Sequence, residues 1–129
     1  MTADGAGSTP GVTRRTLFEL AAVVLVAGGA NAAWQAWSAA SAADAIVARA
    51  APGDIEMFSS VTCVYCAEAR RWLTAHRVPF RECTIERDAA CAARFRALLA
   101  PGTPVLLVRG RALVGFEPRR VAEALGAPS

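Results

Sequence analysis

Two cysteines three positions apart, Cys63 and Cys66, are the residues of this chain with the clearest capacity for chemistry. Such a Cys-x-x-Cys pair can close a small disulfide ring, and it can also bind zinc or Cu(I). The pair follows a short apolar run at residues 55–59 and begins a segment, residues 64–76, that is compatible with a helix. At a helix N-terminus, unpaired backbone N–H groups and the helix dipole favour the thiolate form. We therefore predict that Cys63 is the exposed nucleophile and Cys66 the resolving thiol.

The residues around this pair predict an alternating order of strands and helices. Apolar patterns indicate strands at residues 55–59, 79–85, 105–108 and 112–114. Helices are expected at residues 64–76, from an Asp88 N-cap to Leu99, and from Pro118 to Leu125. The order βαβ, α, ββ, α predicts parallel pairing of the first two strands and a hairpin for the last two.

Further motifs sharpen the interpretation of the cysteine pair. Thr103-Pro104 directly precedes the third predicted strand, and residues 59–66 read Ser-Ser-Val-Thr-Cys-Val-Tyr-Cys. Residues 78–80 read Val-Pro-Phe, and residues 115–118 read Gly-Phe-Glu-Pro. Together these motifs resemble the glutaredoxin family of the thioredoxin fold, over residues 54–125. The resemblance implies an α/β, thioredoxin-like βαβαββα domain, with a four-stranded mixed sheet and flanking helices.

The resemblance also implies an enzyme, a thiol–disulfide oxidoreductase that exchanges disulfides with protein thiols. In this fold Pro104 is expected to be cis and to face Cys63, while Thr103 can pair with an incoming peptide as an extra strand. The substrate-binding residues are then expected to be Val64, Tyr65, Thr103, Pro104, Gly115 and Phe116.

Two departures from the family concern glutathione. Glutaredoxins usually carry a lysine where this chain has Ser60, and their Gly-Gly-x-Asp-Asp segment, which holds glutathione, is replaced here by residues 114–118. That stretch is closer to the Gly-Phe-x-Pro of glutaredoxin-like hydrogen donors to ribonucleotide reductase. We predict no cofactor, and glutathione is doubtful as a co-substrate. The expected partners are protein thiols and disulfides, with a membrane or soluble electron donor.

A second cysteine pair, Cys83 and Cys91, lies outside this motif. Cys83 shares a predicted strand face with Ile85, and Cys91 shares a helix face with Phe95 and Leu98, so both should point inward. They are either two buried thiols or a structural disulfide, which an even cysteine count and an oxidising compartment would favour. A relay of oxidation from Cys63 and Cys66 is a third alternative.

The N-terminal part of the chain predicts a membrane anchor or an export signal. Two arginines, Arg14 and Arg15, precede 21 mainly apolar residues that end at Trp37, and about 20 are needed to cross a bilayer as a helix. The alternatives are a cleaved signal peptide, for which residues 30–32 fit the cleavage pattern, a twin-arginine export signal, and a buried helix of a soluble domain. The membrane anchor and the cleaved signal peptide both place the domain in the periplasm, anchored in the first case and released in the second.

The domain boundaries follow from composition. We expect a disordered segment at residues 1–12, the anchor or signal at residues 13–37, an alanine-rich linker at residues 38–53 and the folded domain at residues 54–129. All fourteen basic residues are arginines, and they are scattered rather than gathered into a stripe with aromatics, so no nucleic-acid partner is predicted.

Two other functions compete with disulfide exchange. A soft-metal (copper) binding or chaperone module could use the same cysteines, but it predicts a βαββαβ order and no proline opposite the site. A redox fold used only for binding is the other alternative, and the presence of both Cys63 and Cys66 argues against it. We expect no metal ligands.

Overall fold

The computed structural model describes residue 11 and residues 13–126. The segment predicted to be disordered, residues 1–12, therefore lies outside the described residues except for residue 11. The chain divides into two compact units, residues 1–36 and residues 37–129, and each is considered by itself.

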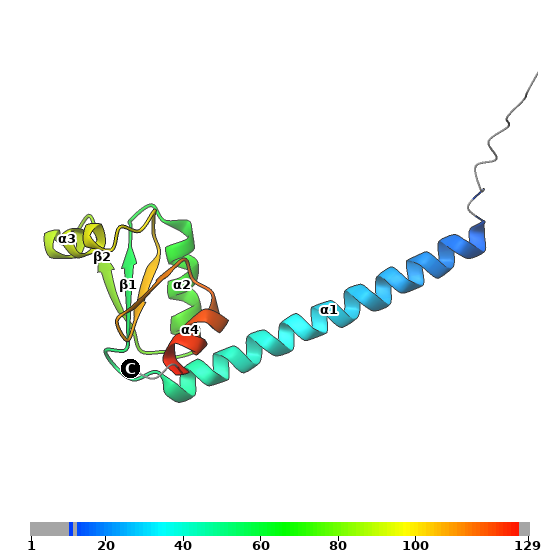
Figure 1. Ribbon diagram of the computed structural model, residues 1–129, viewed down its shortest axis with the longest axis horizontal. Helices are drawn as coiled ribbons and strands as arrows, with labels where there is room; N and C mark the ends of the chain where they lie inside the picture. The colour runs from blue at the N-terminus through cyan, green and yellow to red at the C-terminus, as the bar shows by residue number, and fades with distance from the viewer. Residues whose placement is uncertain (1–10, 12, 127–129) are drawn as a thin grey trace, which may run out of the picture. The chain divides into compact units, whose positions relative to one another are not determined.

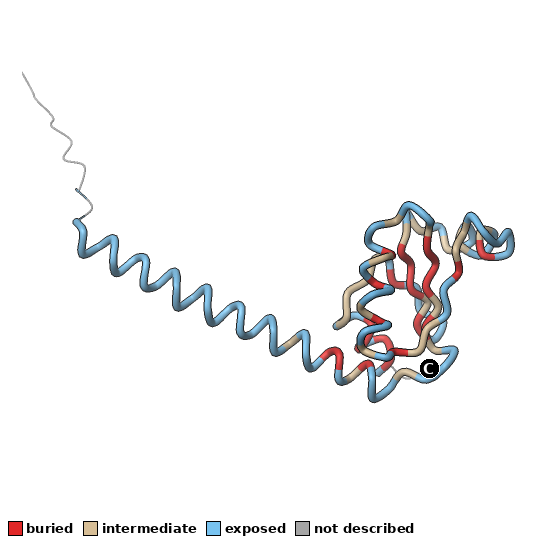
Figure 2. Tube along the Cα trace, turned by 180° about the vertical axis from the view of Figure 1, so that it is seen from behind, coloured by how far each residue is buried: buried red, intermediate tan, exposed pale blue. Residues whose placement is uncertain are grey.

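Residues 14–36 of the first unit belong to one long helix, α1 (Arg14–Arg49). Its residues 14–36 are all exposed, including Leu17, Val24 and Trp34 (Figure 2). The helix is long and apolar enough to cross a membrane, and near an N-terminus a signal sequence has the same character. The buried helix of a soluble domain, one of the alternatives above, is not what the structure shows for this stretch, because its apolar side chains are exposed.

The second unit is built on a four-stranded sheet with the order β2-β1-β3-β4 (Figure 1). The strands are β1 (Ile55–Ser59), β2 (Arg81–Thr84), β3 (Val105–Val108) and β4 (Arg111–Val114). β1 pairs with β2 in parallel, and β3 pairs antiparallel with both β1 and β4. This is the predicted mixed sheet, with a crossover between the first two strands and a hairpin between the last two.

The two faces of the sheet carry different helices because side chains alternate along each strand. Ile55 and Met57 of β1 belong to a core cluster that includes residues of α2 (Val64–Ala75) and α4 (Pro118–Gly126). Phe58 belongs to a second cluster on the opposite face, which packs against α3 (Ala89–Ala97). The result is three layers, with the sheet in the middle.

The end of α1 corrects the linker prediction for residues 38–53. Helix α1 continues without a break to Arg49, and its last turns bury Ala42, Ala43 and Ile46. Ala42 and Ala43 lie four and three positions before Ile46, so both share a helix face with it. Ile46 is fully buried within the first core cluster, beside residues of α4. A spacer would be solvated on all sides, so this stretch is part of the folded unit and not a linker.

Arg109 ties the end of α1 to the rest of the second unit. Its guanidinium donates hydrogen bonds to the carbonyl of Leu125 (2.7 Å), the carbonyl of Arg49 (3.2 Å) and the carboxylate of Asp54 (2.9 Å). This bonding lowers the pKa of the Asp54 carboxyl. The last carbonyls of two helices, α1 and α4, are thus satisfied by one cation at the β3–β4 turn.

Two predicted boundaries were too generous. The strand expected at residues 79–85 is β2 at residues 81–84, because Val78 closes helix α2 by donating to the Leu73 carbonyl (2.9 Å) and the chain crosses to the sheet through Pro79. The helix expected to reach Leu99 ends at Ala97, because Leu99 adopts a left-handed conformation with a φ of 51°.

Candidate active site

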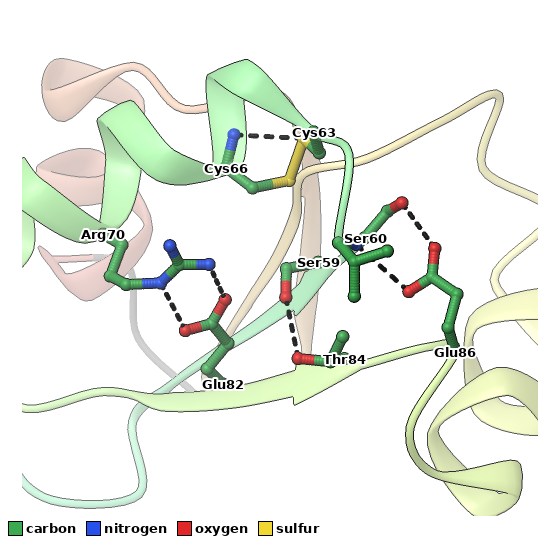
Figure 3. The surroundings of a disulfide bond; sticks show 9 residues. Ser59, Ser60, Cys63, Cys66, Arg70, Glu82, Thr84 and Glu86 are labelled. Carbon is green, nitrogen blue, oxygen red and sulfur yellow. Dashed lines mark hydrogen bonds and ion pairs between the residues drawn. A yellow bond between two sulfur atoms is a disulfide. The ribbon is translucent and has the colours of Figure 1, made fainter.

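The cysteine pair lies at the carboxyl end of β1, where α2 begins (Figure 3). Cys63 is the N-cap of α2, and its Sγ accepts a hydrogen bond from the backbone N–H of Cys66 at 3.0 Å. The two residues form a disulfide with their Cα atoms 5.2 Å apart. Cys63 is partly exposed and Cys66 is fully buried. An incoming sulfur can therefore reach Cys63 but not Cys66.

The loop before Cys63 is held by a glutamate from the segment after β2. The Glu86 carboxylate accepts hydrogen bonds from the Ser60 hydroxyl (2.5 Å) and the Val61 backbone N–H (3.2 Å). The Ser60 hydrogen bond is the main cause of a lowered pKa for the Glu86 carboxyl. Sequence reasoning missed Glu86, because the residues lie 25 or 26 positions apart and nothing in the local pattern joins them.

A polar cavity of about 280 Å³ lies beside Cys63, between the loop that precedes it, α2 and β2. Arg70 of α2 and Glu82 of β2 both line this cavity and form an ion pair, with hydrogen bonds of 2.7 and 2.5 Å (Figure 3). The guanidinium lowers the pKa of the Glu82 carboxyl, and the carboxylate in turn raises the pKa of Arg70. Ser59, which is fully buried, contacts the Thr84 hydroxyl at 3.4 Å. The Arg70–Glu82 ion pair thus fixes α2 against β2 beneath the disulfide.

A second groove, of about 440 Å³, lies on the other side of α2 and is mostly apolar. Five of the six predicted substrate-binding residues line it, namely Tyr65, Thr103, Pro104, Gly115 and Phe116, together with Glu68, Ala69, Pro101, Gly102 and Val114. Val64, the sixth, is exposed at the first position of α2 and does not line the groove.

The groove wall opposite α2 is formed by the loop that enters β3. The Thr103–Pro104 peptide bond is cis, as the resemblance implied. The Pro104 carbonyl accepts a hydrogen bond from the Gly115 N–H at 2.8 Å. Gly115 has a φ of 78°, which only glycine adopts readily, so this connection to the end of β4 depends on the glycine.

The second cysteine pair is also joined. Cys83 of β2 and Cys91 of α3 form a disulfide with their Cα atoms 5.6 Å apart. Both residues are buried in the second core cluster, where Phe95 and Leu98 pack on them, so the inward orientation expected from the pattern is what the structure has. Among the alternatives, the structure has the disulfide and not two free thiols.

The domain that holds this site can be compared with known proteins. A model of the glutaredoxin family matches residues 55–113, from the start of β1 to the end of the hairpin. This domain is therefore similar to the glutaredoxin family. The same domain is also similar to solved structures of the thioredoxin-like fold. The thioredoxin-like protein BC3987, in a mutant form, is 23% identical with a TM-score of 0.52, and covers 57% of this chain and 96% of that one.

Two other solved structures are similar at a lower TM-score. A glutaredoxin from Methanosarcina mazei is 23% identical with a TM-score of 0.49, and covers 58% of this chain and 80% of that one. Methanoredoxin from Methanosarcina acetivorans is 24% identical with a TM-score of 0.49, and covers 63% of this chain and 93% of that one. No curated protein matches the chain in sequence.

Other features bear on the competing metal function. The observed order β1, α2, β2, α3, β3, β4, α4 and the cis proline beside the groove are the arrangement expected for a redox domain and not for the copper-binding module. Within residues 13–126, no three His, Cys, Asp or Glu residues are grouped so that they could hold a metal ion.

Proposed function

We propose that this protein is a thiol–disulfide oxidoreductase that exchanges disulfides with protein thiols through Cys63 and Cys66. The observation that carries the proposal is the N–H of Cys66 directed at the Cys63 sulfur at 3.0 Å, at the first turn of α2. A hydrogen-bond donor and a helix N-terminus favour the thiolate over the thiol at that sulfur. Similarity to the glutaredoxin family model supports the same chemistry.

In the dithiol form, the Cys63 thiolate attacks one sulfur of a partner disulfide. A bond forms between Cys63 and that sulfur, the partner's S–S bond breaks, and the other partner sulfur leaves as a thiolate that takes up a proton. Cys66 then loses its proton and attacks the Cys63 sulfur, which forms the internal disulfide and releases the second partner thiol. Two electrons pass to the partner, and the same steps in reverse pass the disulfide to a partner dithiol.

Burial separates the two cysteines into these roles. Cys66 is fully buried, so it reacts only with the sulfur next to it, whereas Cys63 is accessible to a protein partner. Glu86 and the Arg70–Glu82 pair are positioning residues, because they hold the loop before Cys63 and the start of α2.

We also propose protein thiols, and not glutathione, as the substrates. Ser60 is bound to Glu86 and offers no positive charge for a carboxylate of glutathione, and Glu68 is the one charged residue among the described residues that line the apolar groove. The apolar half of α1 supports an anchored domain, and an anchor with Arg14 and Arg15 on the cytoplasmic side would place the dithiol outside the cytoplasm.

Trapping in cells tests the function and the compartment together. The full chain with Cys66→Ser should accumulate mixed disulfides between Cys63 and partner proteins, because the resolving thiol is absent. The partners, identified by mass spectrometry, should be exported proteins. Cys63→Ser is the matched control and should trap none. Equal trapping by the two variants would contradict the assigned roles, and a set of cytoplasmic partners would contradict the exported location.

A further inference from the structure

Leu99 occupies a position that a leucine disfavours on two counts. It follows the C-cap of α3 with a φ of 51°, a left-handed conformation that favours glycine. Its side chain is also 90% exposed, the most exposed of the large apolar residues between 37 and 126. Its neighbours Leu98 and Ala100 both pack on the cluster around the Cys83–Cys91 disulfide. The loop is therefore anchored on both sides while Leu99 is presented to solvent.

Outside α1, four of the five large exposed apolar residues of the second unit lie close to Cys63 in the chain or line the apolar groove. Apart from Trp37 and Val47 of α1, the large exposed ones between residues 37 and 126 are Val61, Val64, Tyr65, Leu99 and Val114. Three of these lie within two residues of Cys63, and Val114 lines the apolar groove. Leu99 precedes Pro101, the first residue of the loop that lines the same groove, by two positions. Grouped exposed apolar residues mark interaction surfaces.

We infer that Leu99 is a specificity-determining contact for protein substrates, and that its occupant is an extended polypeptide segment with apolar side chains beside its cysteine. The inference rests on the proposed function. Thr103 and Leu99 are four residues apart, so a strand paired at Thr103 needs up to about 13 Å, or four residues, to reach Leu99. A small disulfide does not extend that far, and the described part of the groove wall offers apolar surface and a single charge, Glu68.

The test compares disulfides of two sizes. The full chain in detergent, reduced with dithiothreitol, is assayed on a small disulfide, bis(2-hydroxyethyl) disulfide, and on two self-quenched peptide disulfides. The peptides are identical except for leucines or serines at the four positions on each side of the cysteine. The wild type should prefer the leucine peptide by about tenfold in kcat/KM, the scale of burying an exposed leucine. Leu99→Gly should lose that preference and keep the activity on the small disulfide.

Arg77→Gly is the matched control. Arg77 also has a positive φ (55°), is exposed, and follows α2 at the end away from Cys63. Both glycine variants should raise the midpoint of urea denaturation, because both relieve a left-handed backbone, but only Leu99→Gly should change peptide preference. Retention of the leucine preference in Leu99→Gly would overturn the inference, as would no preference in the wild type.

The role of Leu99 and the proposed function fail in different ways. If the wild type cleaves none of the three disulfides, the proposed function fails and the inference falls with it. If Leu99 instead contacts a second copy of this chain, sedimentation in detergent would show a dimer for the wild type and a monomer for Leu99→Gly. That result would overturn the inference and leave the proposed function standing.

Discussion

At the scale of single residues, the pKa of a charged side chain in the sheet depends on the partner that its position gives it. Glu56 lies on the face of β1 that is covered by α3, and its carboxylate pairs with both nitrogens of the Arg94 fork. That guanidinium also lies over the Phe58 ring, 5.1 Å from its centroid. The hydrogen bond from Arg94 lowers the pKa of the Glu56 carboxyl, and Glu56 raises the pKa of Arg94.

The lowered pKa of Glu56 predicts an acid-dependent loss of stability. A carboxyl whose folded pKa is below its unfolded value stabilises the fold above the unfolded pKa, about 4.3, and that stabilisation is lost as the pH falls through the folded pKa. Glu56→Gln should therefore be less stable than the wild type at pH 6, and the difference should shrink as the pH falls below the unfolded pKa of about 4.3. The measurement is the urea midpoint of residues 37–129 at each pH.

Glu123→Gln is the control for this prediction. Glu123 is an exposed carboxylate of α4 with no ion pair among residues 13–126, so its replacement should leave the difference between pH 6 and pH 3 unchanged. A constant gap between Glu56→Gln and the wild type across the pH range would mean that the ion pair does not carry the effect.

The chemistry at this scale could be predicted only in part. Cys63 and Cys66 could be found from the sequence, because their spacing and their place at a strand–helix junction are local properties. That Thr103, Pro104, Gly115 and Phe116 meet at one groove could be expected, because the glutaredoxin family, which this sequence resembles, carries similar motifs at those places. Glu86 could not, because its bonds to Ser60 and Val61 depend on how two distant loops approach one another.

At the scale of elements, α3 is the part of the domain that depends on a covalent link. It is a short helix of nine residues that begins with the Asp88 side chain accepting from the N–H groups of Ala90 and Cys91. The disulfide from Cys91 to Cys83 joins it to β2, and the Glu56–Arg94 pair joins it to β1. The C-terminal end of α3 leads into the loop that presents Leu99 and continues to the groove.

Removal of this disulfide should destabilise the domain without removing its chemistry. The closed loop of about nine residues corresponds to about 2–3 kcal/mol in the chain-entropy account. The double variant Cys83→Ala/Cys91→Ala should lose about that much in urea denaturation and retain its activity on a small disulfide. The control is Cys63→Ala/Cys66→Ala, which should abolish the activity. Loss of small-disulfide activity in the first variant would show that the second pair takes part in the redox relay.

The order and type of the elements in the second unit were predictable, and their ends were not. Apolar patterns identified the strands, and Asp88 and Pro118 marked helix starts. The early end of α3 could not be read from the sequence, because Leu99 is a residue that rarely takes a left-handed conformation. Leu99 stands out in the structure because a leucine there breaks the usual preference for glycine in a left-handed conformation.

At the scale of the whole molecule, one helix, α1, contains both the long apolar stretch and the first residues of the folded domain. Sequence composition separated an apolar stretch from an alanine-rich one, and it treated the second as a spacer because alanine gives no sign of which face is buried. The structure shows that Ala42, Ala43 and Ile46 form that buried face, and Arg109 caps the end of the helix at the Arg49 carbonyl. The domain thus extends to residues before Asp54, beyond the part that the family match covers.

Ile46 therefore makes a sharp prediction about where the domain begins. It would be exposed to water if residues 38–53 were a spacer, and it is fully buried in the core cluster in the structure. Ile46→Ala in residues 37–129 should cost about 2–4 kcal/mol in urea denaturation, the range for removing a buried isoleucine side chain. Its neighbour Val47 is 51% exposed, so Val47→Ala should stay within about 0.5 kcal/mol of the wild type. Equal small effects at both positions would support a spacer at residues 38–53, whereas the predicted contrast would mean that the last turns of α1 belong to the core and that a chain beginning at residue 54 leaves the core open.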